Sequence, residues 1–89
     1  MAVVQFTPNL ARHVEVSEIT AAGTTAREVL NNAFAQRPAA RGYVLDDQDR
    51  VRKHVVVFVD GQPIADREHL SDTVRSDSEV FVMQALSGG

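Results

Sequence analysis

The segment from His54 to Val59 constrains the fold more than any other part of the sequence. It reads His54-Val55-Val56-Val57-Phe58-Val59, and its run of β-branched and aromatic residues predicts a strand with apolar side chains on both faces. Asp60-Gly61 follows directly, and this dipeptide favours a tight turn, with Gln62-Pro63-Ile64 continuing on the other side. A chain of 89 residues that is 44% hydrophobic has room for one core, which must form against this strand.

The first part of the chain predicts a hairpin followed by a helix. The runs 3–7 and 14–19 are β-branched or alternate with period two, so we expect two strands joined by a long loop that begins at Pro8-Asn9. Thr25-Ala26-Arg27-Glu28 matches a capping box, which places a helix start at Thr25. Pro38 should end that helix. Its apolar stripe consists of Val29, Leu30, Ala33 and Phe34, with Asn31, Asn32 and Gln36 facing away.

The second part predicts an irregular connection and a last strand. From 39 to 53 the apolar pattern weakens, and we expect a loop with a short turn of helix. Leu70 and Val74 are spaced for one helical turn, and the final strand should run from Glu79 to Gln84. This order of elements describes an α+β domain of the β-grasp type, in which one main helix covers one face of a mixed sheet of four to five strands. The first and last strands should be neighbours, the domain should span 1–86, and 87–89 should form a flexible tail.

Alternation along the strands leaves one group of apolar side chains without a helix to cover it. If Val55, Val57 and Val59 face the helix together with Val80, Val82, Val4 and Phe6, the opposite face must carry a second apolar group. An exposed apolar group on a small protein usually marks a contact surface. Two alternatives remain: the 39–53 segment folds over it, or it packs a homodimer. The residues of this group are Val56, Phe58, Phe81 and Met83.

Composition and motifs argue against several functions. Twelve acidic and nine basic residues give a net charge of −3, which disfavours nucleic-acid binding. Without cysteine there is no disulfide, thiolate metal site or cysteine nucleophile, and His13, His54 and His69 lack the spacing of a zinc site. No apolar run is long enough to span a membrane and no leader is evident, so a soluble cytoplasmic protein is expected. With no catalytic motif either, we expect neither an enzyme nor a bound metal or cofactor.

The sequence ends on Ser87-Gly88-Gly89, directly after the last predicted strand. Glycines lack a Cβ atom, so such an end can enter a narrow channel and bring a carboxylate to another protein's reactive centre. Glycines also accumulate at frayed chain ends without any function. Behind a strand of this domain, the arrangement favours a chain whose own terminal carboxylate is a substrate.

These features together resemble the MoaD/ThiS family of ubiquitin-like sulfur carriers. The likeness is strongest in the stretch from Val55 to Gly61, similar to the family's apolar strand and turn, and in the stretch from Glu79 to Gly89, similar to its last strand and tail. Family members often have Asp-Gly-Asp near Ser76-Asp77-Ser78-Glu79, where this chain has no glycine. The long 39–53 segment is similar to that of the family's longer members.

The resemblance implies that other proteins act on the tail. An ATP-dependent activating enzyme of the MoeB/ThiF type would adenylate the Gly89 carboxylate, and a sulfur donor would convert it into a thiocarboxylate for a sulfur-accepting synthase. Gly88 and Gly89 would give clearance at the acyl carbon. The enzyme would dock on the uncovered apolar group together with Leu86, with Arg52 and His54 as a polar rim. ATP and the sulfur donor would be used by the partner.

Two other functions stay open from the sequence. The activated Gly89 could instead acylate lysines of target proteins, which would make the chain a protein modifier. The domain could also be an interaction module whose tail is never activated. The sequence does not separate acceptors in molybdopterin, thiazole, cysteine or tRNA sulfur pathways.

Overall fold

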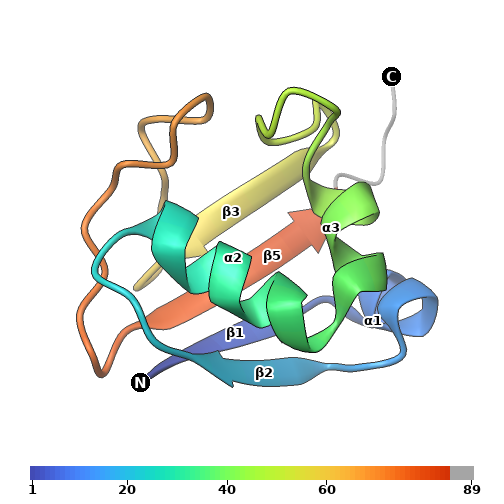
Figure 1. Ribbon diagram of the computed structural model, residues 1–89, viewed down its shortest axis with the longest axis horizontal. Coiled ribbons are helices and arrows are strands. Elements are labelled where there is room, and N and C mark those ends of the chain that lie inside the picture. The colour runs from blue at the N-terminus through green and yellow to red at the C-terminus, as the bar shows by residue number, and fades with distance from the viewer. Residues whose placement is uncertain (85–89) are drawn as a thin grey trace.

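The computed structural model describes residues 1–84. A five-stranded mixed sheet lies on one side of the domain and helices lie on the other (Figure 1). The strand order is β2-β1-β5-β3-β4, in which β1 and β5 are parallel and the other pairs antiparallel. The β-grasp prediction is confirmed, including the neighbouring first and last strands. The elements are β1 (Ala2–Phe6), α1 (Pro8–Val14), β2 (Glu18–Ala21), α2 (Ala26–Gln36), α3 (Pro38–Val44), β3 (Val55–Val59), β4 (Gln62–Pro63) and β5 (Glu79–Gln84).

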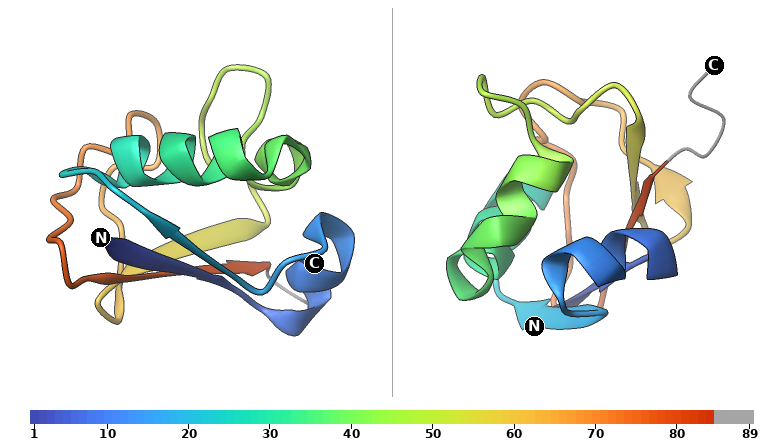
Figure 2. Two further views of the ribbon diagram at one scale, coloured as in Figure 1. Left: turned by 60° about the horizontal axis from the view of Figure 1, so that its bottom comes forward. Right: turned by 90° about the vertical axis from the view of Figure 1, so that its right-hand side faces the viewer.

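The main helix α2 begins where the capping box places it. The Thr25 hydroxyl accepts a hydrogen bond from the Glu28 amide at 3.2 Å, and the Glu28 carboxylate accepts one from the Thr24 amide at 2.7 Å. The bond from the Thr24 amide is the main reason why the pKa of Glu28 lies below its ordinary value. The apolar stripe of α2 is buried against the sheet, as expected. Figure 2 shows α2 and α3 over one face of the sheet, while no helix lies over the other.

Two short helices replace parts of the chain that were predicted as loop or strand. The stretch after β1 is not a loop, because Pro8 sits at the first helical position, where its fixed φ suits α1, and Leu10 is buried. The strand predicted from Val14 is wrong in its start: α1 includes Val14, Glu15 ends the helix in a left-handed conformation, and β2 begins at Glu18. Pro38 ends α2 and also begins α3, which is longer than the short turn predicted there.

Buried apolar side chains and the hydrogen bonds of one carboxylate hold the connection from β4 to β5 in place. Leu70 and Val74 are buried, but they lie in a turn and an irregular segment in place of the predicted helical turn. The Asp66 carboxylate accepts bonds from the Ser71 hydroxyl at 2.7 Å and from the His69 amide at 2.9 Å. These bonds, with that from Ser71 the largest, lower the pKa of Asp66 to about 2.

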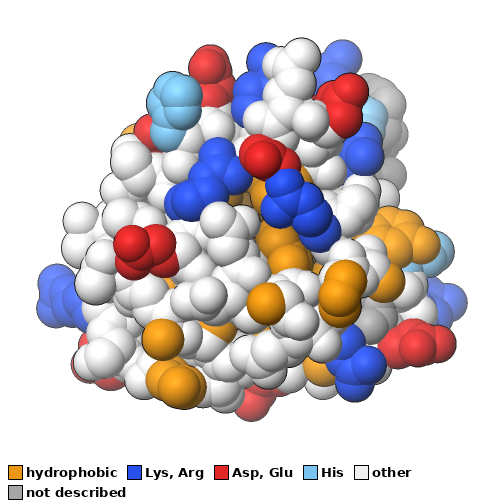
Figure 3. Space-filling model, in the orientation of Figure 1, with side chains coloured by type: hydrophobic (Ala, Val, Ile, Leu, Met, Phe, Trp, Pro, Cys, Tyr) orange, Lys and Arg blue, Asp and Glu red, His pale blue; other side chains and the backbone are white. Residues whose placement is uncertain are grey.

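The core lies between α2 and the covered face of the sheet. Its strand side chains alternate with partly exposed ones, and Val59 is the one member of the predicted covered set that is only partly buried. The largest fully buried side chains include Val4, Leu10, Leu30, Val57, Val80 and Val82. On the side that carries α2, hydrophobic atoms reach the surface only in scattered places among polar and charged side chains (Figure 3).

Candidate functional site

The uncovered side of the sheet carries the apolar group that alternation predicts. Val56 lies opposite Met83, and Phe58 lies opposite Phe81, in the register of β3 and β5. The two phenyl rings are tilted by 49° with their centroids 6.4 Å apart, within the range of a favourable aromatic pair. All four side chains are partly exposed. We call this side, together with the β1 and β5 residues that share its facing direction, the open face.

A shallow hollow lies in the open face. Its volume is about 360 Å³, and most of its surface is apolar. No residue of the 39–53 segment is among those that line it, so that segment does not cover the hollow. The lining residues are Gln5, Phe58, Gly61, Glu79, Phe81 and Met83.

The start of β5 is attached to the turn after β3. Asp60 and Gly61 both have positive φ values, 51° and 83°, and form the two-residue turn between the paired residues Val59 and Gln62. The Asp60 carboxylate accepts the Glu79 amide at 2.9 Å and the Ser78 hydroxyl at 2.8 Å. The Glu79 amide is the main cause of a lowered pKa for Asp60. These bonds place Glu79 at the rim of the hollow.

The turn before β5 closes without the glycine that family members often have. The Ser78 amide donates to the Arg75 carbonyl at 3.1 Å, and the Ser78 hydroxyl accepts the Arg75 amide at 2.9 Å. Ser78 is 2% exposed, and none of the residues 75–79 has a positive φ. The turn therefore needs no residue with glycine's conformational freedom.

Arg52 and His54 lie together at the other end of β5. Both line a depression of about 320 Å³ that also contains Lys53 and Gln84, the last described residue of the strand. We call Arg52, Lys53 and His54 the basic end. The Arg52 guanidinium donates to the Gly42 carbonyl at 2.7 Å, which fixes it towards α3 and not over the open face.

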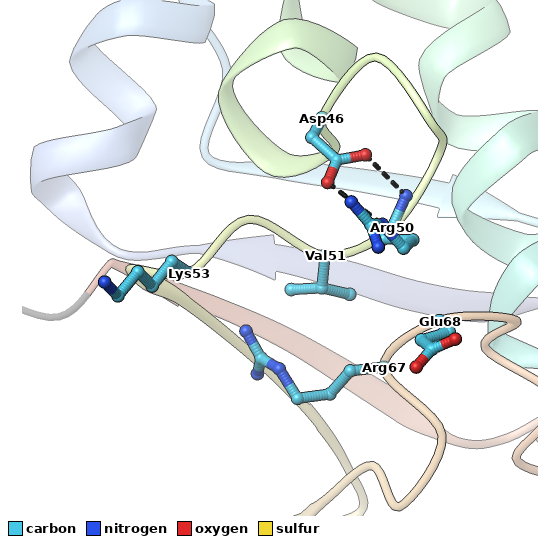
Figure 4. Close-up of a pocket in the computed structure, with 6 residues that line it drawn as sticks. All are labelled: Asp46, Arg50, Val51, Lys53, Arg67 and Glu68. Atoms are coloured by element: carbon cyan, nitrogen blue, oxygen red, sulfur yellow. Dashed lines mark hydrogen bonds and ion pairs between the residues drawn. The ribbon is translucent and has the colours of Figure 1, made fainter.

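The connection that carries the basic end is clamped by Arg67. Its guanidinium donates to the Val55 carbonyl at 2.6 Å and the Arg52 carbonyl at 2.7 Å. In Figure 4 the Lys53 side chain points away from Arg67, whereas Arg50 reaches the Asp46 carboxylate. That carboxylate also accepts the Arg50 amide, the main cause of its lowered pKa. The acidic run 46–49 therefore forms a turn, in which the Asp49 amide donates to the Asp46 carbonyl at 3.0 Å.

Both outer edges of the sheet are partly occupied by side chains. The Thr20 carbonyl of β2 accepts the side-chain amide of Gln36 at 2.8 Å, and the Ala22 carbonyl just after β2 accepts that of Asn32 at 2.7 Å. These two α2 side chains were predicted to face away, and they reach sideways to the edge strand. At the other edge, β4 is short, contains proline and pairs with Phe58 and Val59, and the Val55 carbonyl in the remaining part of β3 accepts the Arg67 guanidinium. These side chains therefore disfavour strand addition by a partner at both edges, and no helix within residues 1–84 covers the open face (Figure 2).

Three of the predicted site residues lie outside the described part of the chain. These are Leu86, Gly88 and Gly89, and the predicted boundary at residue 86 lies there as well. Among residues 1–84 there is no cluster of three or more side chains that could bind a metal ion. Within the same residues, no helix has both the length and the apolar character needed to cross a membrane.

Sequence reasoning missed Gln5, Gly61 and Glu79 as parts of the open face. Alternation along β1 and β5 puts Gln5 and Glu79 on the same side as Phe81, so the signal was present. Their common hollow depends on the register between β1 and β5, in which Gln5 lies opposite Phe81. Gly61 lines the hollow because the turn after β3 brings it there.

The five-stranded mixed sheet, its main helix on one face and the apolar group on the other define a β-grasp protein of the ubiquitin-like class. The chain belongs to the ThiS family, whose model matches residues 4–89. Members of this family are small ubiquitin-like sulfur carriers and are not themselves enzymes. No curated protein shows a significant match to the sequence.

Several solved structures share the fold at low sequence identity. SAMP1 from Haloferax volcanii is 20% identical, with a TM-score of 0.80 over 99% of this chain and 98% of that chain. A chain of the Amycolatopsis orientalis BexX/CysO complex is 17% identical, with a TM-score of 0.84 over 100% of both chains. CysO of Mycobacterium tuberculosis is 16% identical, with a TM-score of 0.82 over 97% of this chain and 100% of that chain.

Proposed function

We propose that this protein carries sulfur on its own C-terminus. A separate ATP-dependent activating enzyme of the MoeB/ThiF type adenylates the Gly89 carboxylate, and a sulfur donor then converts it into a thiocarboxylate for a biosynthetic synthase. The observation that carries the proposal is the ThiS-family match, which extends through Gly88 and Gly89 to the end of the sequence. β5 leads towards these residues from the centre of the sheet.

The chemistry explains why such a chain needs a partner enzyme. A carboxylate is a poor electrophile because its negative charge repels nucleophiles. Its attack on the α-phosphorus of ATP releases pyrophosphate and yields an acyl-adenylate, in which AMP is a good leaving group. A donor sulfur then displaces AMP and leaves sulfur on the Gly89 carbonyl carbon. The described residues supply no part of these steps, and their role is to present the tail.

Docking of the activating enzyme is assigned to the open face. Phe58, Phe81, Met83 and Val56 offer a partly exposed apolar surface beside the strand that leads to the tail, with Leu86 as a further contact. Arg52 and His54 lie at the tail end of β5, where they would form a polar rim. The occupied sheet edges favour contact through a face. A chain of the same fold in the BexX/CysO complex provides a precedent for assembly with a second protein.

Two points go beyond the carrier chemistry itself: which molecule accepts the sulfur, and whether the activated tail is also joined to other proteins. Haloferax volcanii SAMP1 is described as a small archaeal modifier protein, so the same fold occurs in a modifier. A modifier shares the adenylation step and differs in its acceptor, a lysine amine in place of a sulfur donor. A molybdopterin, thiazole, cysteine or tRNA sulfur pathway would each use the same thiocarboxylate.

Intact mass spectrometry of the protein isolated from its native host tests the proposal. We expect a population whose mass gain matches the replacement of one oxygen by one sulfur at the C-terminus. A population linked to other proteins through Gly89 would assign the modifier role. If the tail carries neither sulfur nor a target, and removal of Gly88-Gly89 leaves partner binding and pathway output unchanged, the chain is an interaction module.

Gly89→Val sharpens the same test. A side chain at this position obstructs approach to the acyl carbon, so thiocarboxylate yield should fall strongly in competition with the wild type while the fold persists. Gly42→Val is the matched control, because a Cβ atom at Gly42 meets nothing within 4 Å. Equal yields from Gly89→Val and the wild type would contradict the proposal.

A further inference from the structure

The hollow in the open face combines an aromatic surface with a carboxylate. Phe58 and Phe81 supply paired rings, and Met83 adds a polarizable side chain beside them. Glu79 stands at the rim and is exposed. Within residues 1–84, the Glu79 carboxylate has neither a hydrogen bond nor an ion pair, since only its backbone is engaged by Asp60.

A second polar group on the same side also favours binding of a positively charged group in the hollow. The Gln5 side chain lines the hollow, and its amide nitrogen donates to the Glu18 carboxylate at 3.3 Å. This bond leaves the Gln5 side-chain oxygen as an acceptor and places another negative charge one strand away. None of the residues lining the hollow is basic. Arg52 and Lys53 of the basic end line a separate depression with Gln84, where β5 finishes.

We propose that this hollow accepts an arginine side chain of the activating enzyme, an inference that rests on the proposed function. The aliphatic stem would pack on Met83 and the rings of Phe58 and Phe81, and the guanidinium would reach Glu79 and the Gln5 oxygen. Arginine fits better than lysine, because its planar guanidinium stacks on aromatic faces and pairs with a carboxylate through two parallel bonds. A neutral apolar side chain would leave the Glu79 carboxylate unpaired.

The position of the hollow also constrains the partner. Glu79 begins β5 and Gln84 ends it, so their Cα atoms lie about 16 Å apart along an extended strand. The partner's arginine would therefore lie at a comparable distance from the part of the partner that contacts Gln84. At the far end it would meet the basic end, so a matching surface places its acidic groups there.

A titration followed by NMR tests the hollow without any enzyme. The probes are N-acetyl-arginine amide and its neutral isostere N-acetyl-citrulline amide, added to the full-length protein. The arginine probe should shift resonances of Phe58, Phe81 and Met83 and bind about threefold more tightly than the citrulline probe, as a surface cation–π contact implies. Glu79→Gln should reduce that preference, because it removes the carboxylate and leaves the rings in place. Equal effects of the two probes, or no shift with either, would overturn the assignment.

Adenylation kinetics with the host's activating enzyme give the second readout. Glu79→Gln should raise KM about tenfold and leave kcat unchanged, the expected effect of losing a charged docking contact. Glu68→Gln is the matched control, since Glu68 is exposed and lies away from the open face. If Glu79→Gln is adenylated with an unaltered KM, the arginine site is wrong and the carrier function stands. If the wild type is never adenylated, the carrier function fails and the NMR titration alone decides the hollow.

Discussion

The two faces of the sheet are built from the same strands and similar residues, yet they differ in accessibility. On β5, Val80 and Val82 are fully buried under α2, while Phe81 and Met83 between them are partly exposed. Hydrophobicity alone therefore does not assign a side chain to the core. Because helices cover only one face (Figure 2), the strand side chains divide into one set that stabilises the fold and another that is accessible at the surface.

The covered side is also reinforced by hydrogen bonds that the open face lacks. The Arg27 guanidinium on α2 donates to the Glu68 carbonyl at 2.9 Å and the His69 carbonyl at 3.2 Å, which joins the helix to the connection before β5. Gly23 lets the chain pass close to α2, because a Cβ atom there would lie 2.7 Å from the Val29 nitrogen. On the open face, a side-chain hydrogen bond joins Gln5 to Glu18 near the sheet edge.

A change to aspartate should have the most different effects on the two faces of the sheet. Val82→Asp buries a carboxylate at a side chain that is 0% exposed, and we expect a loss of about 4 kcal/mol or more, enough to unfold a small domain. Phe81→Asp should fold, because its side chain can reach water, but adenylation measured by pyrophosphate release should fall by about 30-fold or more.

Circular dichroism and thermal melting separate the two outcomes. If Val82→Asp melts like the wild type, the covered face is not the core. Unchanged pyrophosphate release from a folded Phe81→Asp would remove the open face from the docking mechanism.

Low pH should destabilise the fold through Asp66, which lies in the connection from β4 to β5. The folded-state pKa of Asp66 is about 2, below its ordinary value of 3.8. A lowered pKa stabilises the fold above the ordinary value, and this contribution is lost as pH falls from about 4 towards 2. Asp66→Asn should therefore lower Tm at neutral pH, and its difference from the wild type should shrink across that range.

Asp47→Asn provides the control for this pH series. Asp47 is exposed, and its carboxylate makes no hydrogen bond within residues 1–84. A Tm difference between Asp66→Asn and the wild type that stays constant down to pH 2 would show that the Asp66 bonds do not stabilise the folded state.

The smallest effect is expected at the edge of the sheet. Asn32→Ala removes the bond to the Ala22 carbonyl, and we expect a loss of about 0.5–1 kcal/mol, as for other solvent-exposed hydrogen bonds. Amide hydrogen exchange should show faster opening of β2 and no change in β3. Asn31→Ala is the control, because Asn31 is exposed on the same helix without such a bond in the described residues. Equal exchange in both variants would contradict the role of Asn32 at the edge.

Much of the fold could be predicted because local signals agree with the tertiary structure. The valine-rich run, the Asp60-Gly61 turn and the capping box at Thr25 each specify an element by chemistry within a few residues. The short helices α1 and α3 were missed for the opposite reason. Each begins at a proline, which was interpreted as a break, and each is stabilised by packing of residues such as Leu10 and Val44 against distant parts of the chain.

The candidate site could be predicted only in part. Alternation along β3 and β5 was enough to place Phe58, Phe81 and Met83 on one face. The hollow also needs Gln5, which reaches it through the parallel pairing of β1 with β5. Strands that are far apart in sequence carry no local signal of their register, so Gln5 and the acidic rim at Glu79 required the structure.

The occupied sheet edges have a consequence for how long a complex lasts. A partner that added a strand would form a ladder of backbone hydrogen bonds with the sheet, and these bonds would have to break before it could dissociate. Because the Thr20 and Ala22 carbonyls on one edge and the Val55 carbonyl on the other are already engaged, strand addition is obstructed there and a partner is left mainly with side chains to contact. If the protein passes from one enzyme to the next, as the proposed function requires, contact through side chains favours its rapid release.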